Sequence, residues 1–232
     1  MRANNMLKLT ASILGCFTIL TVGNHCYNVH FANNLVEEVA NTNMVETQAP
    51  IIYTEVARFD TKYNFADNKV LAEHSDLVVV GKVTNLEDAT NYNPTTKNYG
   101  KARTPGTLEV LQVLKSDESK KLTEIDFLEL GGLISYSEYE KSLLPAQKAK
   151  REYLMQQNGN LNSKSNIYVR QSVENQLQVE EGKTYIMYLK YNSDYDKYMV
   201  VNQPYGVKEY NAETGKIVNH ISNTVETLEK AI

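Results

Sequence analysis

The chain has 232 residues, of which 42% are hydrophobic and 22% are charged, and its formal net charge at pH 7 is −4. These values are typical of a globular protein, and the acidity argues against nucleic-acid binding, which needs a basic surface that displaces counterions. Both cysteines, Cys16 and Cys26, lie near the N-terminus. A domain that follows them holds no disulfide, which favours a bacterial and more specifically a Gram-positive exported protein over a eukaryotic one.

Residues 1–32 have the pattern of a signal peptide or membrane anchor. Arg2 and Lys8 precede an almost wholly apolar run over residues 9–22. This run is shorter than the roughly 20 residues that a membrane-spanning helix needs. The run contains Ile-Leu-Gly-Cys ending at Cys16, which resembles a lipobox with Cys16 as the lipidated residue; alternatively, Cys16 is one more apolar residue of the leader. We expect a protein that is secreted or attached to the outer face of the cytoplasmic membrane through this leader alone.

A linker over residues 33–50 and a single β-rich domain over residues 51–232 are expected to follow. Asn64 is placed to cap a short helix over residues 65–75, with Ala66, Val70 and Leu71 facing inward.

Residues 77–83 form a continuous apolar, β-branched run, which predicts a strand that is buried on both faces. Gly81 within this run indicates a bulge or bend. A polar loop is expected over residues 85–106, then strands over residues 107–114 and 123–130, separated by a charged turn.

A helical insertion is predicted at about residues 133–165. Ser135 and Glu138 form a capping box for a first helix over residues 136–143, and Pro145 suits the first turn of a second helix. The basic run Lys148-Ala149-Lys150-Arg151 is interpreted as a solvated helix face.

Strands and hairpins are expected to resume after the insertion, over residues 167–170, 176–179, 184–191, 198–201, 206–210 and 216–218. A final helix, capped by Ser222 or Asn223, would carry an apolar stripe of Val225, Leu228 and Ile232. The fold class is therefore mainly β with short helices (α+β). The many short strands and the bend at Gly81 favour a Greek-key barrel of the OB type, with the helical insertion and a C-terminal helix.

Three segments carry a resemblance to a known family: residues 71–83, residues 108–115, and residues 181–189 followed by Tyr198 and residues 204–207. Together they resemble a family of uncharacterised secreted proteins and lipoproteins of Gram-positive bacteria, over roughly residues 65–210. That family is similar in strand order to the netrin-like module, the OB-type barrel of the tissue inhibitors of metalloproteinases. Those inhibitors bind the protease metal through an N-terminal cysteine. No cysteine follows Cys26 here, so the resemblance implies the fold and not the inhibitory mechanism.

No residue pattern in the chain predicts a catalytic, metal or cofactor site. His74-Ser75-Asp76 brings three triad residue types together in sequence, but a triad is assembled in space, and a helix end is the more ordinary place for them. Asn192, Asp194 and Asp196 alternate as in a calcium loop. That loop requires a glycine where this chain has Lys197 and a glutamate where it has Gln203, so we interpret the segment as a polar turn.

Tyrosines gather in the C-terminal third of the chain. Tyr185, Tyr188, Tyr198 and Tyr205 are candidates for an aromatic ligand-binding face. The alternative is that tyrosine is a good half-buried strand residue and no ligand is involved.

The leading hypothesis is an exported, non-enzymatic binding module without a cofactor, whose partner is a protein or a cell-wall glycan. One alternative is a secreted hydrolase acting on cell-wall polymers, with a site assembled from scattered residues. Another is a protease inhibitor, by analogy of fold alone.

Overall fold

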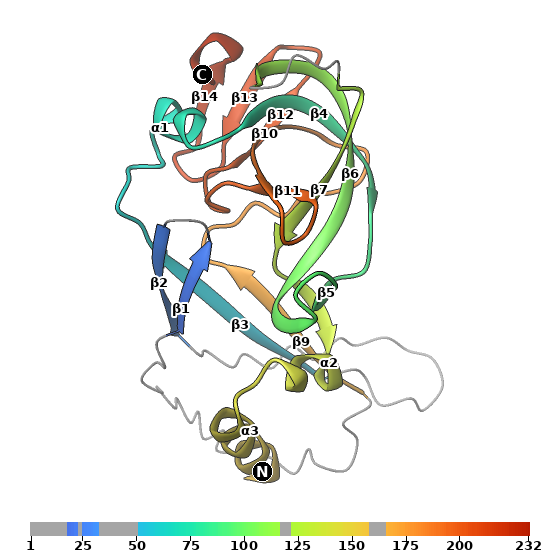
Figure 1. Ribbon diagram of the computed structural model, residues 1–232. Helices are drawn as coiled ribbons and strands as arrows, with labels where there is room; N and C mark the ends of the chain where they lie inside the picture. The colour runs from blue at the N-terminus through green and yellow to red at the C-terminus, as the bar shows by residue number, and fades with distance from the viewer. Residues whose placement is uncertain (1–17, 23–24, 33–50, 117–121, 158–165) are drawn as a thin grey trace, which may run out of the picture.

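The computed structural model describes residues 18–22, 25–32, 51–116, 122–157 and 166–232 (Figure 1). The described chain is mainly β, with few and short helices, as expected. Its strands form a five-stranded and a nine-stranded sheet. In Figure 1 the larger sheet occupies the upper half of the molecule and the smaller sheet the lower half, with the two helices of the insertion at the lower end. Within the described residues, no helix is long and apolar enough to cross a membrane.

The five-stranded sheet joins strands from distant parts of the chain. Its order is β1 (Thr18–Val22), β2 (His25–Ala32), β3 (Ile51–Asp60), β9 (Ile167–Val173) and β8 (Gly132–Ser135). The β3–β9 pair is parallel and the other pairs are antiparallel. The first two strands fall within residues 1–32, whose assignment as a leader stays a prediction. Cys16 lies outside the described residues.

The nine-stranded sheet is built around two apolar strands, β4 (Leu77–Leu86) and β10 (Thr184–Asn192). The order of eight strands is β11-β7-β6-β4-β10-β12-β13-β14, β5 pairs with β6, and β11 pairs a second time with β10. The β11–β7 pair is parallel, and the other pairs are antiparallel. The remaining bounds are β5 (Thr90–Asn93), β6 (Asn98–Ser116), β7 (Glu124–Leu130), β11 (Lys197–Val200), β12 (Val207–Asn211), β13 (Lys216–Asn219) and β14 (Thr224–Thr227).

The prediction for β4 is confirmed, including the irregularity at Gly81. Leu77 to Gly81 are buried without interruption, because apolar side chains pack on both faces of the strand. The register with β6 shifts between Val80 and Gly81. A β-carbon on Gly81 would lie 2.5 Å from Leu108 Cγ and 2.9 Å from the Glu109 carbonyl oxygen. The glycine therefore allows β6 to approach β4 closely at the bend.

The polar loop expected over residues 85–106 is wrong. Residues 90–93 form β5, and β6 begins at Asn98 and continues for 19 residues. The hairpin between them is polar and exposed at its tip, so its residues carry little of the apolar alternation that marks a strand. Tyr92 and Tyr99 nevertheless pack across it, with ring centroids 5.1 Å apart.

The first two helices are shorter than expected, and each has a polar N-cap residue. In α1 (Asn68–Glu73), Asp67 is the N-cap and accepts a hydrogen bond from Lys69 N at 2.9 Å. Asn64 is therefore not the cap, and Ala66 is exposed rather than inward. In α2 (Tyr136–Lys141), Ser135 caps the helix as predicted, and α3 (Pro145–Gln157) begins at the expected proline.

Two further expectations are wrong. Residues 176–179 form no strand, since the side chain of Gln176 bonds to the backbone of Val173 and Leu130 instead. The C-terminal helix is absent: residues 224–227 form β14, and only Leu228–Lys230 form a turn of 3-10 helix. Val225 is 61% exposed, because β14 pairs as an edge strand with β13.

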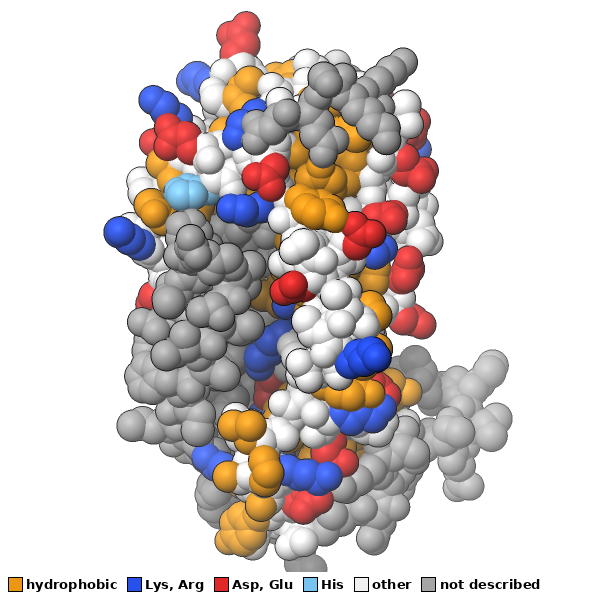
Figure 2. All heavy atoms as spheres, in the orientation of Figure 1, with side chains coloured by type: hydrophobic (Ala, Val, Ile, Leu, Met, Phe, Trp, Pro, Cys, Tyr) orange, Lys and Arg blue, Asp and Glu red, His pale blue; other side chains and the backbone are white. Residues whose placement is uncertain are grey.

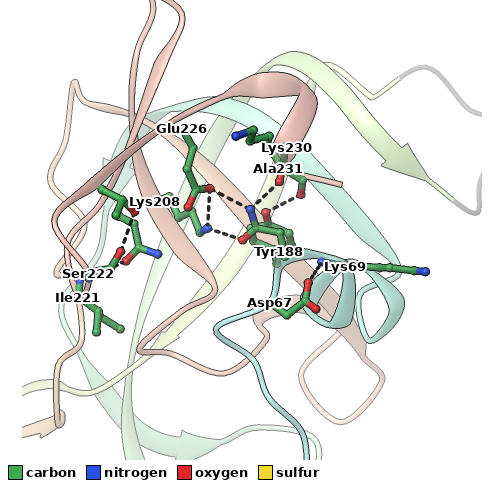
Figure 3. Close-up of polar contacts among 12 residues, drawn as sticks. Asp67, Lys69, Tyr188, Lys208, Ile221, Ser222, Glu226, Lys230 and Ala231 are labelled. Carbon is green, nitrogen blue, oxygen red and sulfur yellow. Dashed lines mark hydrogen bonds and ion pairs between the residues drawn. The ribbon is translucent and has the colours of Figure 1, made fainter.

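Partly buried hydrogen bonds connect the C-terminal residues to α1, β10 and β12 (Figure 3). Lys208 Nζ donates to Asn68 Oδ1 and lies 3.4 Å from Glu226 Oε2. Asn68 Nδ2 donates to Glu226 Oε2 at 2.9 Å and to the Lys230 carbonyl at 2.6 Å. The Tyr188 hydroxyl donates to the Ala231 carbonyl at 2.6 Å. These bonds satisfy polar groups that the short C-terminal elements bury.

Replacing Gly81 with alanine is expected to lower the free energy of unfolding by about 1–3 kcal/mol, because the added methyl group overlaps Leu108 and the β6 backbone. Gly100→Ala in β6 is the control, since its β-carbon meets only Arg103 Nη1 at 3.9 Å. Urea unfolding of both variants measures the difference. Equal stabilities would contradict the close approach at Gly81.

Tyr188→Phe is expected to lower the free energy of unfolding by about 1–3 kcal/mol, because it leaves the buried Ala231 carbonyl without its donor. Tyr191→Phe is the matched control: it removes a hydroxyl that bonds Asp196 Oδ1 at 2.5 Å on a side chain that is 46% exposed. Thermal unfolding compares the two. A Tyr188→Phe protein as stable as the control would show that the hydrogen bond from Tyr188 to Ala231 contributes nothing to stability.

Candidate functional site

An open cavity of about 840 Å³ lies between the two sheets. Its walls come from β3 and β9 of the smaller sheet, from the β5–β6 hairpin, and from the β10–β11 turn with the segment after β11. Figure 2 shows basic side chains in a recess near the middle of this face. The volume falls within the roughly 300–1,000 Å³ range of typical ligand sites.

A buried carboxylate, Glu55, lies at the wall of the cavity. It projects from β3 and is 6% exposed. The Tyr139 hydroxyl and Arg151 Nη2 donate to its Oε1, Gln171 Nε2 donates to its Oε2 at 2.8 Å, and Lys101 Nζ lies 3.8 Å from Oε2. Burial alone would raise the pKa of Glu55, but Lys101, Arg151 and these hydrogen bonds outweigh it and hold the pKa below its ordinary value. Glu55 is therefore ionised and fully paired.

The same cluster ties the helical insertion to both sheets. Of the residues that bond to Glu55, Arg151 lies on α3, Tyr139 lies on α2 and Gln171 lies on β9. The oxygen of the Gln171 amide accepts from Ala102 N of β6 at 2.7 Å. The interpretation of the basic run 148–151 as a solvated face is thus wrong for Arg151, whose side chain is only 15% exposed.

Arg103 is a buried cation on the cavity wall, and it is bonded differently from Glu55. It is 9% exposed. Its Nη1 donates to the Lys101 carbonyl at 3.1 Å, and its guanidinium carbon lies 4.5 Å from the centre of the Tyr195 ring. Its Nε is buried without a hydrogen-bond partner. Burial lowers the pKa of Arg103, with Tyr195 opposing the shift, yet a guanidinium stays charged in proteins.

Gln203 on the cavity wall and Glu129 of β7 share a hydrogen-bond partner, Gln176. Gln176 Nε2 donates to Glu129 Oε1 at 2.8 Å and more weakly to Gln203 Oε1 at 3.4 Å. Gln203 lines the cavity and is 3% exposed, and its Nε2 has no partner. Burial raises the pKa of Glu129 to about 7, against hydrogen bonds from Gln176 and the Val179 backbone. This carboxyl group is therefore partly neutral at physiological pH.

The four candidate tyrosines do not share one open surface. Tyr185 and Tyr188 are 1% and 0% exposed and belong to two different apolar clusters of the larger sheet. Tyr198 packs partly buried against the first cluster and Tyr205 against the second. The four side chains occupy core and core-edge positions, which is where strand tyrosines ordinarily lie.

The other candidates are also placed by the structure. His74 ends α1 as its C-cap, and its ring contacts the Tyr63 ring in a tilted arrangement with centroids 4.2 Å apart. Asn192 and Asp194 lie in the β10–β11 turn, where Asn192 Oδ1 accepts from Asp194 N at 2.9 Å, as expected of a polar turn. Within the described ranges, no group of three His, Cys, Asp or Glu side chains is arranged to hold a metal ion.

Sequence reasoning missed the residues that give the cavity its charge. Glu55 lies in a strand with no motif, and Arg103 lies in what was taken for a polar loop. One weak signal was present: Lys101 and Arg103 alternate around the apolar Ala102, which is the spacing of a strand with both cations on one face.

No protein-family model, curated protein or solved structure matches this chain.

The free energy of unfolding is expected to fall as the pH rises from about 4.5 to about 7, because of Glu129. Its pKa is about 7 in the folded protein against an ordinary 4.5. Between these two pH values the folded state binds more protons than the unfolded state. The stabilisation from the protonated carboxyl group is therefore fully present below about pH 4.5 and is lost as the pH rises through about 7. The loss amounts to about 3–4 kcal/mol.

Glu129→Gln keeps a neutral side chain at every pH and should remove this part of the slope, making the variant the more stable protein at pH 8. Glu124→Gln, an exposed substitution in the same strand, is the control. Urea unfolding at pH 4.5, 6, 7 and 8 measures the slopes. An unchanged slope in Glu129→Gln would contradict the assignment.

Proposed function

We propose that this chain is an exported binding module and that it binds a cell-wall glycan in the cavity between its two sheets. The observation that carries the proposal is the cavity itself: about 840 Å³ of open space whose wall holds a buried cation, Arg103, with a donor left unpaired. Buried polar groups in folded proteins are ordinarily paired, so an unpaired one on a cavity wall is what a ligand would satisfy.

The composition of the wall favours a glycan over a protein partner. Side-chain amides both donate and accept hydrogen bonds, which suits the hydroxyl groups of sugars. Aromatic rings at the cavity offer apolar faces to a sugar. One of these rings, Tyr195, packs against the guanidinium of Arg103. The amides on the wall are Asn93, Asn98, Gln171, Asn192, Asn202 and Gln203.

The barrel proposed for the larger sheet is of the OB, netrin-like type. Five of its strands pair in the order β4-β6-β7-β11-β10, and β10 pairs again with β4. The parallel β7–β11 pair and the helices between β7 and β10 support a Greek-key connection. Export from a Gram-positive bacterium rests on the apolar leader over residues 9–22 and on the family resemblance.

Co-sedimentation with insoluble Gram-positive cell-wall glycan tests the proposal. The full chain is expected to bind, and Ser193→Trp, which places a large ring at the part of the cavity wall formed by the β10–β11 turn, is expected to weaken binding at least tenfold. Ser222→Trp on the exposed C-terminal turn, outside the cavity, should bind as the unmodified protein does.

Equal binding by both variants, or none by the unmodified chain, would contradict the proposal. Release of soluble fragments over time would show the hydrolase alternative instead. Capture of a wall protein without glycan would show the protein-binding alternative.

A further inference from the structure

Arg103 is a buried charge for which the described residues supply no carboxylate partner. A buried ion is costly unless it is paired, and Glu55 shows how this chain pairs one, with four donors or cations around a single carboxylate. Arg103 has instead one backbone carbonyl on Nη1 and the face of Tyr195. A counter-ion for Arg103 would therefore have to come from outside the described residues.

The bonding of Arg103 leaves one edge of its guanidinium for that counter-ion. Nη1 is occupied by the Lys101 carbonyl, and Tyr195 covers one face of the planar group. The edge formed by Nε and Nη2 remains, and Nε on it has no partner. This edge presents two parallel N–H donors, which is the geometry that a carboxylate accepts with both oxygens.

The surrounding charges favour an anion at this edge. Glu55, the carboxylate on the same wall, is paired with Arg151 and Lys101 and forms no ion pair with Arg103 among the described residues, so it does not balance the charge of Arg103. Gln203 Nε2, on the same wall, is a further donor without a partner. Low exposure strengthens each of these interactions.

We propose that Arg103 binds the carboxylate of an acidic sugar, so that the ligand of the cavity is a carboxylate-bearing glycan. The inference rests on the proposed function and names the ligand class for the same cavity. The sugar ring would lie against the amide and aromatic wall, and its carboxylate would occupy the Nε–Nη2 edge, with Gln203 Nε2 on the same wall as a further donor. Arg103 is then the residue that distinguishes acidic from neutral sugars.

A matched pair of probes tests the inference: methyl glucuronide and methyl glucoside, which differ only in a carboxylate against a hydroxymethyl group. Each is titrated into the full chain at constant ionic strength, and binding is followed by NMR shifts of backbone amides. We expect the glucuronide to bind at least tenfold more tightly than the glucoside and to shift amides around residues 101–103 and 202–203.

Variants separate charge from geometry. Arg103→Gln should abolish the preference for the glucuronide, and Arg103→Lys, which keeps the charge without the two-pronged edge, should retain only part of it. Arg58→Gln is the control: it removes the same charge from an exposed arginine that pairs with Glu174 at 3.0 Å, outside the cavity, and should keep the full preference. If Arg103→Gln does not fold, the lysine variant decides.

The outcomes distinguish this inference from the proposed function. Equal binding of the two probes, or an unchanged preference in Arg103→Gln, overturns the inference while leaving glycan binding in place. Tighter binding of inorganic phosphate at the same amides would overturn the carboxylate class, and tighter binding of N-acetylalanine than of the glucuronide would overturn the sugar. No shift at the cavity with any probe or with neutral wall oligosaccharides would overturn both proposals.

Discussion

The arrangement of the molecule depends on a single ionised carboxylate, Glu55. It receives Arg151 and Tyr139 from the helical insertion and Gln171 from β9, while Lys101 approaches from β6. Breaking a buried pair of this kind by removing one partner typically costs about 3–5 kcal/mol. Because its partners come from four separate segments, Glu55 fixes the insertion against the smaller sheet and fixes that sheet against the long β6 hairpin strand.

That cluster also gives the cavity its character. With Glu55 paired, the neighbouring Arg103 keeps its charge without a counter-ion from the described chain, and the backbone carbonyl of Lys101 orients its guanidinium. A wall made this way is rigid on the side of Glu55 and incompletely bonded on the side of Arg103 and Gln203. This arrangement favours binding, because the donors are already positioned and little conformational entropy is lost when a ligand contacts them.

Much of the fold could be predicted from the sequence, and little of the site. The runs at Leu77–Val83 and Thr184–Tyr191 predicted β4 and β10 because strands buried on both faces are continuously apolar. The caps at Ser135 and Pro145 predicted the insertion because local hydrogen bonding decides helix starts. The β5–β6 hairpin was missed because its polar, proline- and glycine-containing sequence lacks that pattern. β14 was missed because it is an exposed edge strand, and the spacing of Val225 and Leu228 suits a helix equally well. Glu55 and Arg103 meet only through tertiary pairing, which no local pattern encodes.

The parallel pairing of β3 with β9 has a consequence for how the chain acquires its structure. Most of the sequence of the domain separates the two strands. In the sheet, Ile51 pairs with Ile167 and Ala57 pairs with Val173. The smaller sheet therefore cannot close until synthesis has passed the whole insertion, and contacts this distant form slowly. Until then, the edge of β3 that faces β9 has no partner strand, and an unpaired edge of this kind is prone to aggregation during folding.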